Sequence, residues 1–236
     1  MFHGKMKAIT FSYDDAVVQD RRLVELLDKY GLKATFNLNS EWFGKKHVFK
    51  AGGQDFEHIK IEEHEVRELY KNHEVAAHTL SHPKLPTLPD EEVIRQVEQD
   101  RINLSNLVGY KVVGMAYPGG SANHDARVEK LIKEHTGIKY CRTVESTGAF
   151  EWKQDMYCFH PSAHHLETNG KTYELCKKFI EMETDKPQLL YIWGHSYEMD
   201  FGDRWGELEE IFRLISGRDD IFYGTNREVF ECCKCI

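Results

Sequence analysis

Short β-rich runs alternate with longer amphipathic stretches along most of this chain, and this alternation limits the folds open to it more than any other feature. It is typical of strands joined by crossover helices, and therefore of a parallel sheet. Strands are expected at residues 7–13, 33–39, 74–79, 111–117, 137–143, 187–195 and 220–224. Helices are expected at residues 19–30, 61–72, 89–108, 124–135, 172–183 and 207–216.

The chain has 236 residues, which accommodate about seven to eight β/α units in a single domain spanning residues 1–236. This number fits a closed or nearly closed (β/α) barrel better than an open doubly wound sheet. The glycine-rich fingerprint of a dinucleotide-binding fold is missing after the first strand, where "SYDDAVVQD" stands instead. Residues 41–60 are expected to form a long irregular connection, and such loops often serve as lids or binding loops.

Charge and hydropathy argue against two classes of partner. The net charge is −8 at pH 7 and no run of Lys and Arg exceeds two residues, which disfavours a nucleic-acid-binding surface. The longest apolar runs, such as "LLYIW", fall far short of the roughly 20 residues that a membrane span needs. No apolar signal segment precedes the first strand, so a cytoplasmic location is expected, where the six cysteines would be free thiols.

Polar residues gather where the predicted strands end. In a β/α barrel the chemistry lies at the carboxyl ends of the strands, so these residues are expected to meet. Each also has a structural explanation: the aspartates could cap a helix, a histidine could be a buried ring, and "YPGG" could be a plain turn. The residues in question are Asp14, Asp15, His78, His82, Tyr117 to Gly120, Arg142 and His195.

The two histidines His78 and His82 lie four residues apart, but Pro83 disfavours a helix there, so the pair belongs to a strand end that runs into a loop. Two imidazoles and one carboxylate can hold a divalent metal ion with open positions, an arrangement found for zinc and for non-haem iron. Either Asp14 or Asp15 could supply the carboxylate. The other aspartate would then be placed to take a proton from water, as in a hydrolase.

Three segments resemble motifs of the polysaccharide deacetylase family, which is also called the NodB homology domain. "SYDDA" is similar to its first motif, "HTLSH" to its second, and "YIWGHS" to a histidine motif near its end. The resemblance covers the chain from about Ile9 to His195. It implies a distorted (β/α) barrel that removes N- or O-acetyl groups from sugars with a divalent metal ion.

Carried over residue by residue, the resemblance assigns a role to each member of the strand-end group. It implies that Asp14 is the general base, that Asp15, His78 and His82 are the metal ligands, and that His195 is the general acid. Zinc is the first expectation for the metal, with cobalt, iron and nickel as alternatives. The turn after the fourth strand and an aromatic residue before His195 are expected to bind or orient the substrate; these residues are Tyr117, Pro118, Gly119, Gly120 and Trp193.

The third motif departs from the family pattern. Alignment on Pro118 and Gly120 places Ala116 where the family has an arginine that orients the base. We expect Arg142, at the end of the neighbouring strand, to hold Asp14 instead, because an arginine can make a two-pronged contact with a carboxylate. The alternative is that Arg142 meets solvent. The family's usual acidic partner for the catalytic histidine has no clear counterpart in the chain.

Three functions therefore stay open. The first is the removal of an acetyl group from an N-acetylated sugar, and the second is hydrolysis of a small non-sugar amide or cyclic ureide at the same metal site. The third is a non-catalytic carbohydrate-binding barrel, although binding alone would need neither Asp14 nor His195. The expected partner is a small molecule or an oligosaccharide, and a homo-oligomer is left open.

Overall fold

The computed structural model describes residues 1–51, 54–120 and 122–236. Its main sheet is parallel and curled, with the strand order β7-β6-β5-β2-β1-β9-β8, and β10 pairs with the start of β1. The strands are β1 (Lys7–Asp14), β2 (Ala34–Leu38), β5 (Glu74–Ala77), β6 (Gly114–Ala116), β7 (Tyr140–Arg142), β8 (Ala163–His164), β9 (Gln188–Gly194) and β10 (Ile221–Tyr223).

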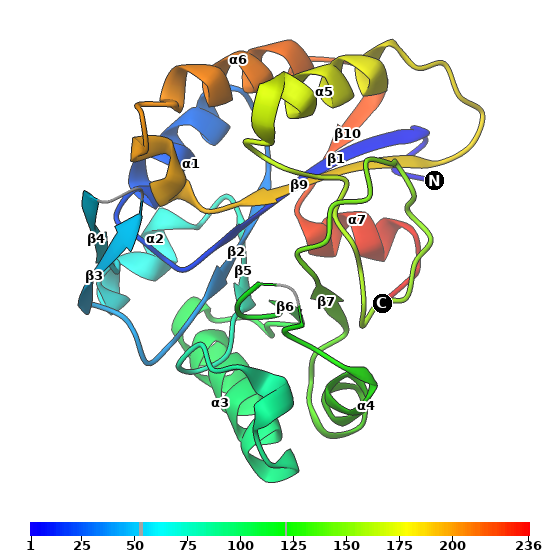
Figure 1. Ribbon diagram of the computed structural model, residues 1–236. Coiled ribbons are helices and arrows are strands. Elements are labelled where there is room, and N and C mark those ends of the chain that lie inside the picture. The colour runs from blue at the N-terminus through cyan, green and yellow to red at the C-terminus, as the bar shows by residue number, and fades with distance from the viewer. Residues whose placement is uncertain (52–53, 121) are drawn as a thin grey trace.

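Helices cover the outside of the curled sheet, with α5 and α6 together at one end of the view and α3 and α4 at the other (Figure 1). The α-helices are α1 (Asp20–Lys29), α2 (Val66–Leu69), α3 (Asp90–Val108), α4 (Ala126–His135), α5 (Lys171–Glu181), α6 (Trp205–Ile215) and α7 (Asn226–Cys232). Short 3-10 turns are η1 (Glu63–Glu65), η2 (Leu85–Thr87), η3 (Thr168–Gly170) and η4 (Ser196–Asp200).

The first strand is the centre of the sheet. Every residue of β1 is buried, as expected for a parallel strand covered on both faces. Its register with both neighbours brings Asp14 beside Asn37 of β2, and Tyr13 beside Gly194 of β9. Gly194 has to be a glycine, because a Cβ there would lie 2.4 Å from the ring of His165. The close packing at this level positions the strand-end residues.

The predicted fold class is confirmed. The sheet curls into a half-barrel of β/α units, and a parallel bridge between Arg142 and Phe159 brings β7 close to the segment that precedes β8. The barrel is thus distorted rather than regular. In the described part of the chain all six cysteines are free, as the sequence predicts.

The expectation of an irregular connection at residues 41–60 is wrong. This segment contains an antiparallel hairpin of β3 (Lys46–Ala51) and β4 (Gln54–Ile59). Its end is tied to the loop after β1, because Ile61 N donates to Ala16 O at 2.9 Å and Lys60 forms a bridge with Val17. The available sequence signal was a glycine pair between two runs that include Val and Phe; those glycines, residues 52 and 53, lie outside the described residues.

One helix prediction also needs correction, and one helix was missed. The helix expected at residues 61–72 is reduced to η1 and α2, and it ends where Tyr70 turns inward: its ring packs on Phe36 at 4.4 Å between centroids and its hydroxyl donates to Asp20 at 2.6 Å. The last helix, α7, was not predicted. Its start carries a capping box, in which Thr225 and Glu228 each bond the other's backbone N–H.

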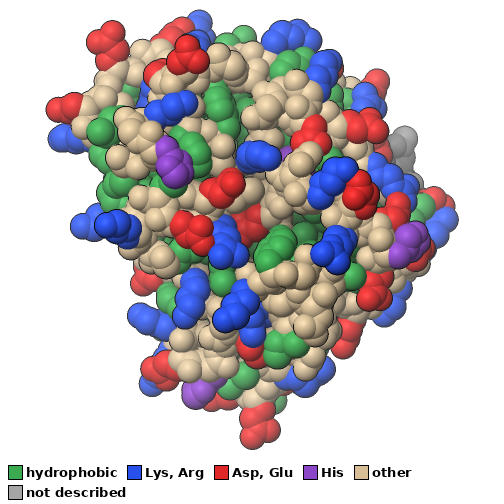
Figure 2. All heavy atoms as spheres, turned by 180° about the vertical axis from the view of Figure 1, so that it is seen from behind, with side chains coloured by type: hydrophobic (Ala, Val, Ile, Leu, Met, Phe, Trp, Pro, Cys, Tyr) green, Lys and Arg blue, Asp and Glu red, His purple; other side chains and the backbone are tan. Residues whose placement is uncertain are grey.

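Acidic and basic side chains are interspersed on the face shown in Figure 2. The described residues on this face therefore present no extended field of a single sign. Among the described helices, none combines the length and the apolar character that crossing a membrane would require.

Candidate metal centre and active site

The carboxyl ends of β1, β5 and β9 bring the predicted metal ligands and catalytic residues together. Ligand atoms of Asp15, His78 and His82 all lie within 4.8 Å of one another. His195 Nε2 lies 4.0 Å from Asp14 Oδ2 and 3.9 Å from Asp15 Oδ2. Residues that are far apart in the sequence thus surround one point at the rim of the barrel.

Both neighbouring aspartates reach this point because the strand ends between them. Asp14 is the last residue of β1, whereas Asp15 and Ala16 have φ angles of +86° and +52°. This left-handed backbone breaks the alternation that would otherwise point adjacent side chains to opposite faces. Such a conformation is costly for a non-glycine residue and is found where function requires it.

The loop that carries the two histidines has a similar backbone. Thr79 and His82 have φ angles of +68° and +59°. Asn39 holds the loop by donating from Nδ2 to the carbonyls of His78, at 2.5 Å, and Thr79, at 2.9 Å. The rings of His78 and His82 meet edge to face at 4.9 Å between centroids.

The ring of His78 is oriented for metal binding. Its Nδ1 donates to the carbonyl of Ala116 at 2.9 Å, so Nε2 faces the site without a proton. Burial lowers the pKa of His78 to about 4, which keeps the ring neutral. Ala116, which stands where the third motif is expected to have an arginine, therefore contributes through its backbone.

Asp14 is held by two donors from neighbouring strands. Arg142 Nη2 donates to both of its carboxylate oxygens, at 2.6 and 2.5 Å, and Asn37 Nδ2 donates to Oδ1 at 2.8 Å. Burial opposes ionisation, but the charges of Arg142 and His195 keep the pKa of Asp14 below its usual value. The predicted contact between Arg142 and Asp14 is thus confirmed, whereas Asn37 was not anticipated.

Arg142 is fully buried and packs against a second predicted residue. Its guanidinium carbon lies 4.6 Å from the centre of the Trp193 ring, a cation–π contact. Trp193 also lies 5.7 Å from the ring of His195, measured between centroids. The indole therefore contacts both the arginine and the histidine and limits the conformations of their side chains.

An unpredicted carboxylate, Glu198, organises a cluster of three histidines. It accepts a hydrogen bond from His165 Nε2 at 2.8 Å, and lies 3.0 Å from His164 Nε2 and 3.4 Å from His195 Nδ1. Burial lowers the pKa of His195, but Glu198 and the two site aspartates outweigh burial and raise it to about 9. Glu198 follows His195 by three residues, so the pattern "HSYE" was the signal for it.

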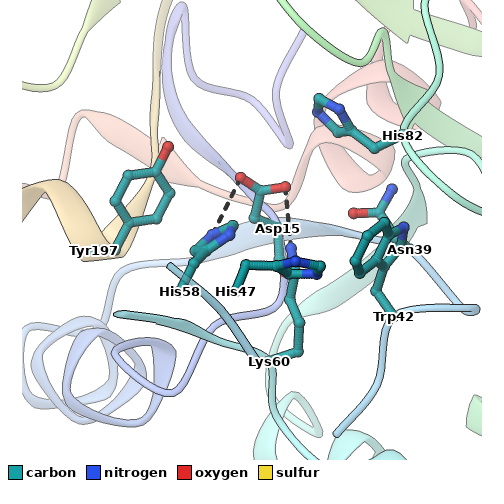
Figure 3. Close-up of a pocket in the computed structure, with 8 residues that line it drawn as sticks. All are labelled: Asp15, Asn39, Trp42, His47, His58, Lys60, His82 and Tyr197. Atoms are coloured by element: carbon teal, nitrogen blue, oxygen red, sulfur yellow. Dashed lines mark hydrogen bonds and ion pairs between the residues drawn. The ribbon is translucent and has the colours of Figure 1, made fainter. Parts of the chain in front are cut away.

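A pocket of about 310 Å³ opens beside the metal ligands (Figure 3). Trp42 and Tyr197 stand on opposite sides of Asp15 in this view, and the hairpin β3–β4 and the residue after it supply basic side chains. Lys60 Nζ donates to Asp15 O at 2.5 Å and to its Oδ1 at 3.3 Å. The sequence marked this segment as a binding loop without identifying its residues. The lining consists of Asp15, Asn39, Trp42, His47, His58, Lys60, His82 and Tyr197.

The turn after β6 lies outside this lining. The Tyr117 ring is fully buried and its hydroxyl donates to Tyr157 O at 2.8 Å, so its side chain has a packing role. Pro118 is buried, whereas Gly119 and Gly120 are exposed. Gly119 has a φ angle of +86°, a left-handed backbone conformation that favours glycine. All four residues of this turn were predicted to bind or orient the substrate. The buried Tyr117 side chain is the least accessible to one.

Residues 3–140 match the family model described as polysaccharide deacetylase. No curated protein sequence matches the chain. Among solved structures, the Streptococcus pyogenes deacetylase PplD in complex with acetate has a TM-score of 0.57 and 15% identity, and the match covers 71% of this chain and 68% of that one.

Two further structures match along nearly the whole chain. A family 4 carbohydrate esterase from Streptomyces lividans in complex with acetate has a TM-score of 0.58 and 11% identity, with 94% and 93% of the two chains covered. A family 4 acetyl xylan esterase from Clostridium thermocellum, in complex with a cobalt ion, has a TM-score of 0.58 and 14% identity, with 95% and 91% covered. At these identities the similarity is one of fold.

Proposed function

Because the chain belongs to the polysaccharide deacetylase family, whose members are metal-dependent hydrolases, we propose that it removes an acetyl group from an N-acetylated sugar. The observation that carries this proposal is the meeting of Asp14, Asp15, His78, His82 and His195 at one point of the barrel rim.

The residues present fit a divalent metal ion. The ligand atoms of Asp15, His78 and His82 are close enough to share one ion, and His78 presents an unprotonated nitrogen because Ala116 fixes its tautomer. One carboxylate and two imidazoles leave positions open, as in catalytic zinc sites, and zinc is the metal we propose. When bound, such an ion supplies Lewis acidity toward an acyl carbonyl and toward water.

The protein's own groups would then move the protons. Asp14, ionised and held by Arg142 and Asn37, takes a proton from the attacking water. His195, whose charged form Glu198 favours, gives a proton to the leaving nitrogen as the C–N bond breaks. The water oxygen ends in the acetate, and the sugar leaves as an amine.

The turn after β6 is our candidate for contact with the developing oxyanion. The N–H of Tyr117 is already donated to Arg142 O at 3.0 Å, and Pro118 has none. The backbone N–H groups of Gly119 and Gly120 are therefore the ones proposed for this role.

The pocket size bears on the substrate. About 310 Å³ is at the low end for small-molecule sites, which suits a single sugar ring or a small amide better than several rings enclosed together. Hydrolysis of a small non-sugar amide therefore stays as the second candidate. The cytoplasmic location and the homo-oligomer also remain proposals, which cell fractionation and size-exclusion chromatography would test.

The test is an acetate-release assay on N-acetylated mono- and oligosaccharides, with small amides and cyclic ureides assayed in parallel. Metal-free protein is loaded with zinc, cobalt, iron or nickel. Asp14→Asn should keep the metal and lose about 10²- to 10⁴-fold in turnover, because it removes only the base. His82→Ala should lose both metal and activity, whereas the exposed control His135→Ala should lose neither.

Each other outcome has a defined meaning. Near-full turnover of Asp14→Asn would reduce Asp14 to a structural residue, and full metal occupancy of His82→Ala would overturn the ligand assignment. Turnover of amides or ureides alone would select the second candidate. Sugar binding without any hydrolysis would select the non-catalytic barrel.

A further inference from the structure

A second group of metal-ligating side chains lies outside the pocket, between the start of α4 and the segment that follows β7. Ligand atoms of His124, Glu129 and Cys158 all lie within 4.8 Å of one another. His124 Nε2 is 3.3 Å from Cys158 Sγ and 3.4 Å from Glu129 Oε1. His160 Nε2 lies 3.8 Å from the same sulfur.

The three shortest separations match three of the six edges of a tetrahedral zinc site. With zinc–nitrogen and zinc–oxygen distances of about 2.0–2.2 Å and a zinc–sulfur distance of about 2.3 Å, neighbouring ligand atoms lie roughly 3.3–3.6 Å apart. The three pairs around His124 Nε2 and Cys158 Sγ fall within about 0.3 Å of that range. His124, Glu129 and Cys158 therefore need little movement to share one ion, whereas the His160 ring, which lies near the sulfur but outside that group of three, would have to move toward the other two.

The second ring nitrogen of each histidine is already engaged. His124 Nδ1 lies 2.9 Å from Asn123 Oδ1, and His160 Nδ1 lies 2.7 Å from Thr143 Oγ1. When each Nδ1–H donates to its oxygen, each Nε2 presents a lone pair toward the sulfur and the carboxylate. Partners of this kind orient histidine ligands in known metal sites.

The backbone explains why the ligands face the same way. Phe159 pairs with β7 through two hydrogen bonds, from its N to Cys141 O and from Thr143 N to its O, both at 2.9 Å. Cys158 and His160 flank Phe159, and this pairing brings His160 Nε2 to 3.8 Å from Cys158 Sγ. Glu129 stands one helical turn beyond the Asp125 N-cap of α4 and reaches the same place.

We propose that His124, Glu129, Cys158 and His160 form a second metal site, which takes zinc. A thiolate with two imidazoles and one carboxylate favours zinc over magnesium or calcium, and four protein ligands make a closed, structural site. Binding deprotonates the Cys158 thiol and releases that proton to solvent.

A metal ion bound at this site would stabilise two segments that border the proposed catalytic centre, the turn after β6 and the end of β7. Asn123, which contacts His124, also donates to Tyr117 O at 3.2 Å and Gly119 O at 3.0 Å. Thr143, which contacts His160, directly follows Arg142. One bound ion would therefore link the turn after β6 to the segment that carries the arginine.

Metal counting and cobalt spectroscopy test the proposal without relying on activity. Wild-type protein loaded to saturation should hold two zinc ions per chain, and the Cys158→Ser and His82→Ala variants one each. The cobalt form should show sulfur-to-metal charge-transfer absorption from Cys158. The proposed catalytic site cannot produce this absorption, because none of its ligands is a sulfur. Cys158→Ser should abolish this absorption, whereas a control with the three terminal cysteines replaced, at positions 232, 233 and 235, should keep it.

The opposite results would overturn the site. One zinc ion per wild-type chain that is retained in Cys158→Ser and lost in His82→Ala would do so, as would a cobalt form without sulfur absorption. Loss of the absorption in the terminal triple variant, with retention in Cys158→Ser, would place the sulfur ligand at the carboxyl terminus instead. If Cys158→Ser does not fold, the wild-type count and spectrum still decide, and failure of deacetylation would affect neither.

Discussion

At the scale of single residues, the missing arginine of the third motif is replaced from the neighbouring strand. Ala116 and Arg142 are direct partners in the β6–β7 register, so both stand at the same level of the barrel. Ala116 is small and buried, and Arg142 donates from Nη2 to both carboxylate oxygens of Asp14. With Asp14 as the proposed base, Arg142 is the group that orients it.

Arg142→Lys should lower turnover about tenfold or more while leaving metal content unchanged. Lysine keeps the charge but lacks the nitrogen that donates to Thr143 O and the planar group that lies over Trp193, so its charge is held less firmly beside Asp14. Since Arg142 holds the pKa of Asp14 below its usual value, the weaker contact should raise that pKa and shift the acid limb of the rate profile to higher pH. Steady-state kinetics across pH measure both effects. An unchanged pH profile, equal to that of the exposed control Arg95→Lys, would contradict the role.

At the scale of elements, the residue that follows the hairpin β3–β4, Lys60, adds a positive charge to the proposed metal centre. Lys60 is buried and forms an ion pair with Asp15 at 3.3 Å, on the carboxylate proposed as a metal ligand. In the metal-free protein this contact stabilises a buried negative charge. The same ammonium group repels an incoming cation, so the hairpin balances the stability of the metal-free site against its affinity.

Lys60→Met should therefore destabilise the metal-free protein, on the order of 3 kcal/mol, because Asp15 loses a buried partner. The same change should tighten metal binding about tenfold or more, since a nearby positive charge is removed. Unfolding in denaturant and competition with a chelator measure the two effects. Lys46→Met, an exposed ion-pair residue of the same hairpin, is the control and should change neither. Weaker metal binding in Lys60→Met would show that Lys60 assists the site.

The start of β5 is braced by another buried carboxyl group. Glu74 accepts hydrogen bonds from Thr35 of β2 at 2.7 Å, from the Tyr140 hydroxyl of β7 at 2.8 Å and from Arg227 N of α7 at 2.9 Å. Burial raises the pKa of Glu74 to about 7. The folded protein therefore binds a proton there that the unfolded chain releases near pH 4.5, and this contribution to stability is lost as pH rises through 7.

Glu74→Gln should remove this pH dependence. The amide stays neutral, its oxygen can accept from Thr35 and Arg227 N, and its NH2 can donate to the Tyr140 hydroxyl. The free energy of unfolding of the variant, relative to wild type, should therefore increase between pH 5 and pH 8. The gain should be on the order of 3 kcal/mol, from about 1.4 kcal/mol per pKa unit. Urea unfolding at the two pH values measures it, with the exposed Glu68→Gln as control. Equal gains in both variants would show that Glu74 does not titrate as described.

At the scale of the whole molecule, the rim of the barrel concentrates groups that cost stability when no metal is bound. Asp14 and Asp15 are both buried beside one another, and the backbone around them is left-handed at Asp15, Ala16, Thr79 and His82. A divalent ion that binds only the folded state raises the free energy of unfolding by mass action and so offsets part of this destabilisation. Folding stability and site assembly are therefore coupled.

Chelation should lower the thermal unfolding midpoint of the metal-loaded protein. An ion present at 100 times its dissociation constant adds about 2.7 kcal/mol, which for a chain of this size corresponds to roughly 5–10 °C. Differential scanning fluorimetry with and without chelator measures the shift. His82→Ala should lose the part that belongs to the catalytic site. A shift of equal size in His82→Ala would assign all of the stabilisation to another site.

The sequence alone determined the features that depend on local order. The alternation of strands and helices predicted the barrel, and "SYDDA" with "HTLSH" identified the metal ligands and base as candidates, because strand ends meet at one rim whatever the loops do. Arg142 could be proposed for the same reason, since strand order alone placed it beside Ala116.

Only the tertiary structure decided how those residues are supported. Glu198 meets His164 and His165 from a different strand end, and Lys60 reaches Asp15 only because residues 46–59 pair as a hairpin. Tyr117 turned into the core because its hydroxyl finds Tyr157 O there. These contacts join residues 33, 45 and 40 positions apart. Periodicity reports which face of an element is buried, but not which distant side chain will satisfy a buried charge or hydroxyl group.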